Sequence, residues 1–270
     1  MNRRGWMPHA FSIELRKMIS YRVDFWVNFF AGSLAEIAIA YFLWKAVYDH
    51  RGIDSLGGFT LRGMICYYLL ASVIGRMIRG MEHGILAMDI YDGSLSRYLV
   101  YPLSFVEYKY IAYLAQFVTG LCQLVLASGC FVLFFGIPAE IQVTVPGVLM
   151  GVVACLFANF LYFTIACLVD LTAFWADNVW SLNVMLRFAT FLLGGAMIPL
   201  NLFPASLQKA IYALPFAYMI SFPIECMMGK VHFARFASGM GTVAFWGATF
   251  TAGLAWVWSR GTKQYTGVGM

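Results

Sequence analysis

The chain has 270 residues, of which 61% are hydrophobic and only 11% are charged, and its formal net charge is +5. Soluble domains are about 45–50% apolar and about 25% charged, so this composition excludes an ordinary water-soluble domain. The hydrophobic residues stand in blocks of roughly 20, the length with which a helix crosses about 30 Å of hydrocarbon. The sequence therefore predicts an all-α polytopic membrane protein with a single transmembrane domain over residues 1–270.

Residues 1–24 are expected to form a cytoplasmic interfacial helix. Phe11, Leu15, Met18 and Ile19 recur at helical spacing within this segment, and charged side chains occupy the rest of the helix circumference. Such an amphipathic helix lies in the membrane surface with its apolar face toward the lipid. The alternative is that the basic residues of this segment act as a topology signal.

Six transmembrane helices are predicted from the apolar blocks. Gly147 and Gly151 in the fourth have the GxxxG spacing that lets helices approach closely, which is a weak signal in a glycine-rich span. The six spans cover approximately residues 25–48, 63–81, 108–136, 146–170, 178–200 and 239–259.

The basic residues stand beside these spans instead of forming one patch, which is typical of topology signals and argues against a nucleic-acid partner. They are enriched before the first span, around the segment after the second, and in the C-terminal tail. Because cytoplasmic loops carry the excess of Lys and Arg, both termini are expected on the cytoplasmic side. The membrane is expected to be a bacterial plasma (inner) membrane.

Another apolar stretch, residues 203–228, contains Pro204, Pro215 and Pro223, and prolines at this spacing prevent one uninterrupted helix. Two short helices that enter and leave the membrane from the same side fit this pattern better than a span. We therefore expect an extracytoplasmic re-entrant hairpin over residues 201–238, between spans five and six. It must pack against the other helices, because non-helical backbone at membrane depth has to be buried in protein or face water.

Ionisable residues inside a span are costly, so a functional or pairing role is their default, and Glu36 and Arg187 are the clear cases. Glu36 in the first span and Arg187 in the fifth would both lie about 14–16 Å above the inner boundary, at about 1.5 Å per residue. This equal depth permits an ion pair. The alternative is that each side chain faces a polar cavity or a partner subunit.

The sequence predicts no catalytic residue, no metal and no cofactor bound by this chain. The pattern GxxxxGK followed by Ser or Thr is missing, so any ATP must be handled by another chain. The four histidines are scattered, and neither HExxH nor a cluster of histidines and carboxylates indicates a metal. The six cysteines lack metal or disulfide spacing and are interpreted as packing residues.

The cytoplasmic segment between the second and third spans begins with a short amphipathic pattern, in which Ile85, Met88 and Ile90 fall near one face. Asp92 and Gly93 then break the pattern. By itself this periodicity indicates no more than an interfacial loop.

The residues that follow carry a resemblance. The run Asp92-Gly93-Ser94-Leu95, followed by Leu99 and Pro102, resembles the coupling-loop signature of type-2 ATP-binding-cassette (ABC) exporter permeases. The rest of the chain is similar to one branch of that family, long catalogued as a domain of unknown function. The matching residues are Ala173, Phe174 and Trp175 after the fourth span, Gly194, Gly195 and Pro199 at the end of the fifth, and Phe203, Pro204, Leu214, Pro215, Phe216 and Pro223 in the hairpin.

The resemblance implies that residues 82–107 form a coupling loop that docks into an ATPase subunit. Asp89 would then supply a polar contact, Gly93 a turn, Leu95 an apolar docking contact and Pro102 a helix end. The expected interface residues are Asp89, Asp92, Gly93, Leu95, Leu99 and Pro102.

The resemblance also implies an assembly of two permease chains, the second being the same or a related chain, with two copies of an ABC ATPase subunit that binds ATP and Mg. The substrate would be an amphipathic, lipid-like, drug-like or glycan molecule exported between the permeases, among membrane lipids. The hairpin would cap this path, although its aromatic residues could instead form a membrane-interface belt. The gate candidates are Phe203, Pro204, Pro215, Phe216 and Pro223.

Two other functions stay open at this point. A membrane-embedded lipid-modifying enzyme would need acidic residues that converge at the inner interface, and only Asp89, Asp92, Asp170 and Asp177 qualify. An ion-coupled secondary transporter would show inverted repeats and broken helices in corresponding halves, whereas one interrupted region is present.

Overall fold

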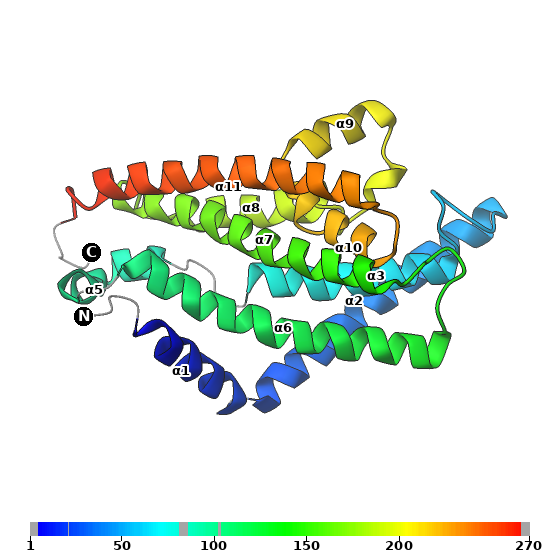
Figure 1. Ribbon diagram of the computed structural model, residues 1–270, viewed down its shortest axis with the longest axis horizontal. Helices are drawn as coiled ribbons and strands as arrows, with labels where there is room; N and C mark the ends of the chain where they lie inside the picture. Colours follow the sequence, from blue (N-terminus) through cyan, green and yellow to red (C-terminus); the bar gives the residue numbers. More distant parts are fainter. Residues whose placement is uncertain (1–4, 21, 81–85, 102–103, 266–270) are drawn as a thin grey trace.

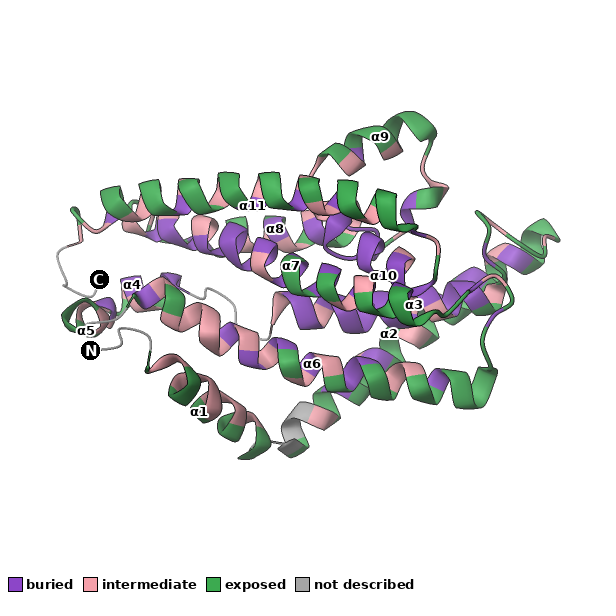
Figure 2. Ribbon diagram, in the orientation of Figure 1, coloured by how far each residue is buried: buried purple, intermediate pink, exposed green. Residues whose placement is uncertain are grey.

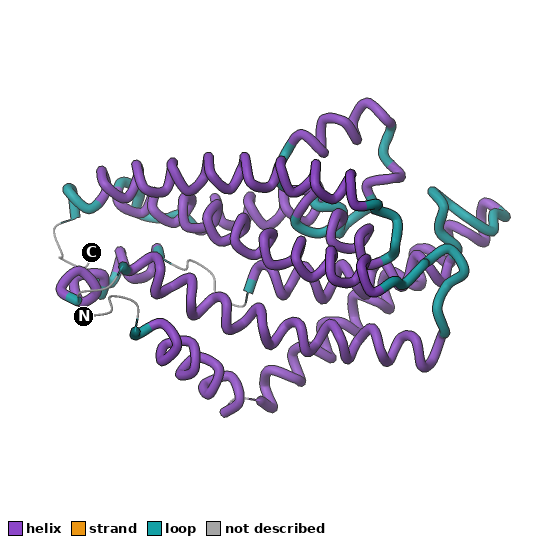
Figure 3. The backbone as a smooth tube through the Cα atoms, in the orientation of Figure 1, coloured by secondary structure: helices purple, strands orange, loops and turns teal. Residues whose placement is uncertain are grey.

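The chain is built of helices joined by short turns, as the ribbon in Figure 1 and the tube in Figure 3 show. The one strand-like feature of the described residues is an isolated bridge between Leu56 and Phe59. This confirms the predicted all-α class. The computed structural model describes residues 5–20, 22–80, 86–101 and 104–265.

Five helices of the described chain are long and apolar enough to cross a membrane, and a bent pair of shorter helices would make six if it were one span. The chain is therefore a multi-pass membrane protein. The first four predicted spans coincide with helices to within three residues, and the sixth lies within a helix that begins six residues earlier. The five are α2 (Arg22–Arg51), α3 (Leu61–Arg79), α6 (Phe105–Phe135), α7 (Val145–Asp170) and α11 (Phe233–Gly261).

Three of these helices begin at a hydroxyl side chain that caps them. The Oγ atoms of Thr60, Ser104 and Thr144 each accept a hydrogen bond from the backbone N–H three residues ahead, at 3.2, 3.4 and 3.2 Å. Such a cap satisfies an N–H that has no partner within the helix and contributes about 0.5–2 kcal/mol. The starts of α3, α6 and α7 are therefore set by local sequence.

The predicted fifth span is shorter than expected. Its helix, α8 (Trp180–Leu193), has 14 residues. At about 1.5 Å per residue it extends about 21 Å, less than the hydrocarbon thickness of about 30 Å. The helix stops because Gly194 forms its C-cap and Gly195 takes the left-handed φ of 86°, from which no ordinary helix continues.

The interrupted apolar stretch after α8 is confirmed as a bent helix pair. Helix α9 (Ala205–Ala213) and the segment Phe216–Met227, which includes α10 (Ser221–Met227), meet at 83°. In Figure 1, α9 stands out from the bundle, whereas α10 lies against it. Six of the seven residues of α10 are buried, and α10 packs against α7 and α3.

The N-terminal helix α1 (Met7–Ser20) packs along α6. Phe11, Leu15 and Met18 are half-buried on its inner face, and Met18 Sδ accepts a hydrogen bond from the Thr119 hydroxyl at 3.6 Å. Ile19, expected on the same face, is 62% exposed. The predicted helix is thus present, and its placement in a membrane surface stays a prediction.

The core lies between α3, α7 and α10, whereas α2 and α11 are mostly exposed, as the colours of Figure 2 show. Only 17% of the most apolar window of α2 and of α11 is buried, against 67% for α3 and 61% for α7. Exposed apolar helix faces are the normal state of a protein whose solvent is lipid. The exposed faces of α2 and α11 therefore support a membrane setting.

The GxxxG spacing of Gly147 and Gly151 serves the contact between α7 and α10. A Cβ atom at Gly147 would lie 2.8 Å from the backbone oxygen of Cys226, and one at Gly151 would lie 3.1 Å from that of Pro223. Glycine is required at both positions because α10 approaches the backbone of α7 directly.

Replacing Gly147 by leucine is therefore expected to destabilise the folded chain by about 1–3 kcal/mol through overpacking against α10. The measurement is the apparent unfolding temperature of the purified chain in detergent. Gly129→Leu in α6 is the matched control, since no atom lies within 4 Å of a Cβ built there. Equal destabilisation by both substitutions would contradict a close α7–α10 contact.

Candidate functional site

The α4–α5 segment, residues 86–101, consists of two short helices and the turn between them, and it lies near the end of the bundle where α1 begins and α11 ends (Figure 1). Helix α4 spans Ala87–Tyr91 and α5 spans Leu95–Val100. Between them Gly93 has φ of 76°, which favours glycine, and the Ser94 N–H donates to Asp92 Oδ1 at 2.9 Å. Hydrogen bonds from Ser94 also hold the pKa of the Asp92 carboxyl below its usual value.

A second set of polar contacts connects this turn to α6. The Ser94 hydroxyl donates to Asp89 Oδ1 at 2.8 Å, and Lys109 Nζ lies 2.6 Å from Asp89 Oδ2. The Asp89 and Lys109 side chains are only 15% and 17% exposed. Because this ion pair is short and largely shielded from water, it fixes the α4–α5 segment to the start of α6.

Further hydrogen bonds connect the same segment to α7 and to the chain that follows it. The Leu86 N–H donates to Asp170 Oδ2 at 2.9 Å, and the Asn183 amide of α8 donates to Asp170 Oδ1 at 2.8 Å. The Tyr91 hydroxyl donates to the Ala176 carbonyl at 3.0 Å. Asp170, 1% exposed, thus joins α4, α7 and α8 at one point.

The exposed side chains of the segment are mostly apolar, and Asp92 and Arg97 are the charged exceptions. Met88, Leu99, Val100 and Tyr101 are exposed by 63%, 49%, 84% and 57%. Leu95, by contrast, has 0% exposure. A side chain with no accessible surface cannot touch a partner, so the expected apolar docking contact of Leu95 is corrected to a packing role.

The structure also changes the expected role of Asp89. Its carboxylate is engaged by Ser94 and Lys109 inside the chain instead of being presented outward. Asp92 and Leu99 are exposed at this surface, and Gly93 forms the predicted turn. Pro102 lies outside the described residues.

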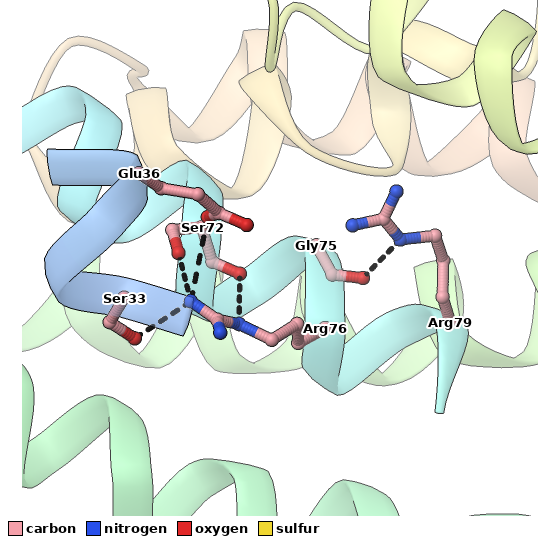
Figure 4. A network of polar contacts seen from close by, with 6 residues as sticks. All are labelled: Ser33, Glu36, Ser72, Gly75, Arg76 and Arg79. Atoms are coloured by element: carbon pink, nitrogen blue, oxygen red, sulfur yellow. Dashed lines mark hydrogen bonds and ion pairs between the residues drawn. The ribbon is translucent and has the colours of Figure 1, made fainter. Parts of the chain in front are cut away.

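Glu36 forms its ion pair with Arg76 of α3, and not with Arg187. Arg76 Nη2 lies 3.4 Å from Glu36 Oε2 and donates to Ser33 Oγ at 2.7 Å and to the Ser72 hydroxyl. Figure 4 shows this cluster, with Arg76 directed toward α2 and Arg79, one turn later, folded back over Gly75 of its own helix. Equal depth in the membrane did not identify the partner of Glu36, because depth alone does not show which helix faces this side chain.

Arg187 lines a cavity of about 460 Å³ together with Arg76 and Arg79. The cavity lies where α3 and α7 end and α8 begins, and α4 closes one side of it. We call it the arginine cavity. Its other polar side chains include Asp170, Asn178 and Asn183. Arg187 thus lines a cavity whose wall includes some polar side chains, and a role for Arg187 there stays a prediction.

The gate candidates of the hairpin are divided between its outer and inner parts. Pro204 is the exposed N-cap of α9, and Phe203 precedes it, half-buried. Pro215 and Pro223 are buried, and Phe216 begins the short 3₁₀ turn before α10. A shared gating role for these residues stays a prediction.

Three residues that organise these sites are missing from the predicted set: Lys109, Arg79 and Arg76. Basic residues at helix ends are typical of topology signals, so nothing in the local sequence distinguishes them. Asp170 could be noticed because an acidic residue at the end of an apolar span is costly unless paired. Among the described residues no group of three or more His, Cys, Asp or Glu side chains could hold a metal ion.

A family model described as an ABC-2 family transporter protein matches residues 34–269, which is most of the chain. Searches of curated proteins and of solved structures found no significant match. The matched region contains the α4–α5 segment, the arginine cavity and the bent helix pair.

Proposed function

We propose, because this chain belongs to the ABC-2 family of transporter membrane proteins, that it is the permease subunit of an ATP-driven exporter. ATP and Mg would bind to a separate ATPase subunit, present in two copies beside two permease chains. The second permease would be the same chain or a related one. An amphipathic or lipid-like substrate would leave the cytoplasm or the inner leaflet between them.

The observation that carries this proposal is the α4–α5 segment. It presents exposed apolar side chains at one end of the bundle, and its inner side is fixed to α6, α7 and α8 by short polar contacts. A docking element that transmits ATPase movement needs both properties, since it must bind its partner and must not deform. Leu99, Val100 and Tyr101 would provide the apolar contacts, with Asp92 beside them.

The proposed orientation follows from the same assignment. The α4–α5 segment, within the proposed coupling loop of residues 82–107, would lie in the cytoplasm with both termini, beside a bacterial plasma (inner) membrane. Residues 1–24 would lie on that face. The bent pair, within residues 201–238, would lie on the opposite side and cap the translocation path.

The test is to purify the C-terminally tagged chain gently from its native membrane and to identify its companions by mass spectrometry. A stoichiometric ABC ATPase subunit is expected. Val100→Asp should lower the recovered ATPase by about tenfold, because a desolvated charge without a partner opposes binding.

Ile137→Asp is the control, since Ile137 is 51% exposed in the loop after α6, at the far end of the bundle. A wild-type chain that repeatedly purifies folded and alone would contradict the proposed assembly. If Val100→Asp and Ile137→Asp lowered the recovered ATPase equally, the α4–α5 segment would not be the docking element.

A further inference from the structure

The arginine cavity has an unusual charge for an apolar bundle. Its lining contains three arginines, Arg76, Arg79 and Arg187, and one carboxylate, Asp170. Both oxygens of that carboxylate already accept hydrogen bonds, from the Leu86 N–H and from the Asn183 amide. Asp170 is thus committed to the helix contacts, and Arg76 already pairs with Glu36.

Arg79 contributes the charge that is available to a ligand. Its Nε donates to the Gly75 carbonyl of its own helix at 2.9 Å, and within the described chain no carboxylate lies within ion-pair distance of its guanidinium. Figure 4 shows this guanidinium folded back over Gly75, with no dashed line joining it to the Arg76 and Glu36 cluster. A guanidinium presents a planar set of N–H donors that matches phosphate and carboxylate geometry.

The mouth of the cavity is apolar. Met88 and Trp180 belong to its lining and are 63% and 65% exposed. Trp180, Phe188 and Phe191 fall within about 80° of one another on α8, at about 100° per residue, and form an exposed apolar stripe. A molecule with an anionic head and an apolar body would place the head beside Arg79 and the body along this stripe.

We propose that the arginine cavity binds the anionic, phosphate-type headgroup of an amphiphile taken from the membrane. Its volume of about 460 Å³ lies within the range of about 300–1,000 Å³ common for small-molecule sites. Basic pockets between transmembrane helices recognise anionic headgroups by the same chemistry. If the chain is an exporter permease, as proposed above, anionic amphiphiles are the class of substrate that it exports, and this part of the inference rests on the proposed function.

Binding is measured on the full purified chain, with any subunits that accompany it, using fluorescent phosphatidylglycerol in micelles of a neutral detergent. Phosphatidylglycerol is expected to bind at least about tenfold more tightly than phosphatidylcholine, and Arg79→Gln should remove this preference. Arg260→Gln is the control, since Arg260 lies in the last turn of α11 over the Trp256 ring and lines no part of the cavity. The assay needs no ATPase, so it can fail while co-purification succeeds.

Competition with inorganic phosphate identifies the source of the anion. Displacement of phosphatidylglycerol by micromolar phosphate would support the anion site and assign it to a free anion, whereas resistance to millimolar phosphate would support the amphiphile. Equal affinity for phosphatidylglycerol and phosphatidylcholine in the wild type overturns the proposal, and this comparison stands even if Arg79→Gln does not fold. An unchanged preference in a folded Arg79→Gln chain overturns it as well.

Discussion

Replacing Gly93 by valine is expected to lower the substrate-stimulated ATP hydrolysis of the assembled complex by roughly tenfold or more. The chain should remain inserted and folded. Gly93 has φ of 76°, a conformation that costs a side-chain-bearing residue about 1–2 kcal/mol and a β-branched one more. The turn would relieve this strain by changing the angle between α4 and α5, which would move the apolar docking face away from its partner.

The matched control for this substitution is Gly136→Val. Gly136 has a similar φ of 72° at the end of α6, and no atom lies within 4 Å of a Cβ built there. Both variants therefore place a β-branched residue at a positive φ, but only one alters the α4–α5 segment. Hydrolysis is measured in reconstituted vesicles with and without substrate. Loss of stimulation in both variants, or in neither, would contradict a coupling role for this turn.

Replacing Lys109 by methionine is expected to destabilise the chain by about 3 kcal/mol, near the low end of the range for breaking a buried ion pair. Methionine keeps the apolar stem, but the Asp89 carboxylate, 15% exposed, loses the charge that lies 2.6 Å away. For a chain of this size, the apparent unfolding temperature in detergent should fall by roughly 6–12 °C.

A double-mutant cycle separates the ion pair from other effects at Lys109. Asp89→Asn in the Lys109→Met background should restore part of the lost stability, because the amide carries no charge and can still accept from Ser94. Lys17→Met is the control: Lys17 lies 3.8 Å from Glu14 and is 60% exposed, so its loss should cost less than about 1 kcal/mol. Equal losses from Lys17→Met and Lys109→Met would contradict the shielded pair.

These two substitutions probe different properties of one element. The Gly93 turn sets the relative direction of α4 and α5, whereas the Asp89–Lys109 pair fixes that arrangement to α6. If the segment transmits ATPase movement, Lys109→Met should also weaken stimulation in the folded fraction. Asp170 extends the connection to α7 and α8, two helices that line the arginine cavity. The proposed docking face and the proposed binding cavity thus share Met88 and the contacts around Asp170.

The sequence alone was enough to predict that this protein lies in a lipid bilayer and where most of its helices begin and end. Mean composition and blocks of apolar residues predict membrane spans because crossing a bilayer requires a fixed length of helix. The caps at Thr60, Ser104 and Thr144, the break at Gly194 and Gly195, and the bend among the hairpin prolines act through the backbone of neighbouring residues. Features of this kind can be predicted because their causes are local.

The candidate site was predictable in part for the same reason. The Asp92-Gly93 turn is a local pattern, and its position between two short apolar helices follows from the sequence. The structure showed which apolar residues of these helices face outward, since a helix of five or six residues has too few positions for its periodicity to identify the buried side. Leu95 turned inward and Val100 outward, although both are apolar.

Tertiary structure alone decided the partners. Glu36 pairs with Arg76, Lys109 pairs with Asp89, and Gly147 lets α10 approach α7, and each contact joins two different helices. In a bundle without strands, one side chain's depth and helix face leave several possible partners, and the choice depends on how all the helices rotate and cross. Three arginines line one cavity for the same reason. The sequence shows on which helix each arginine lies, but only the packing of the helices brings the three together.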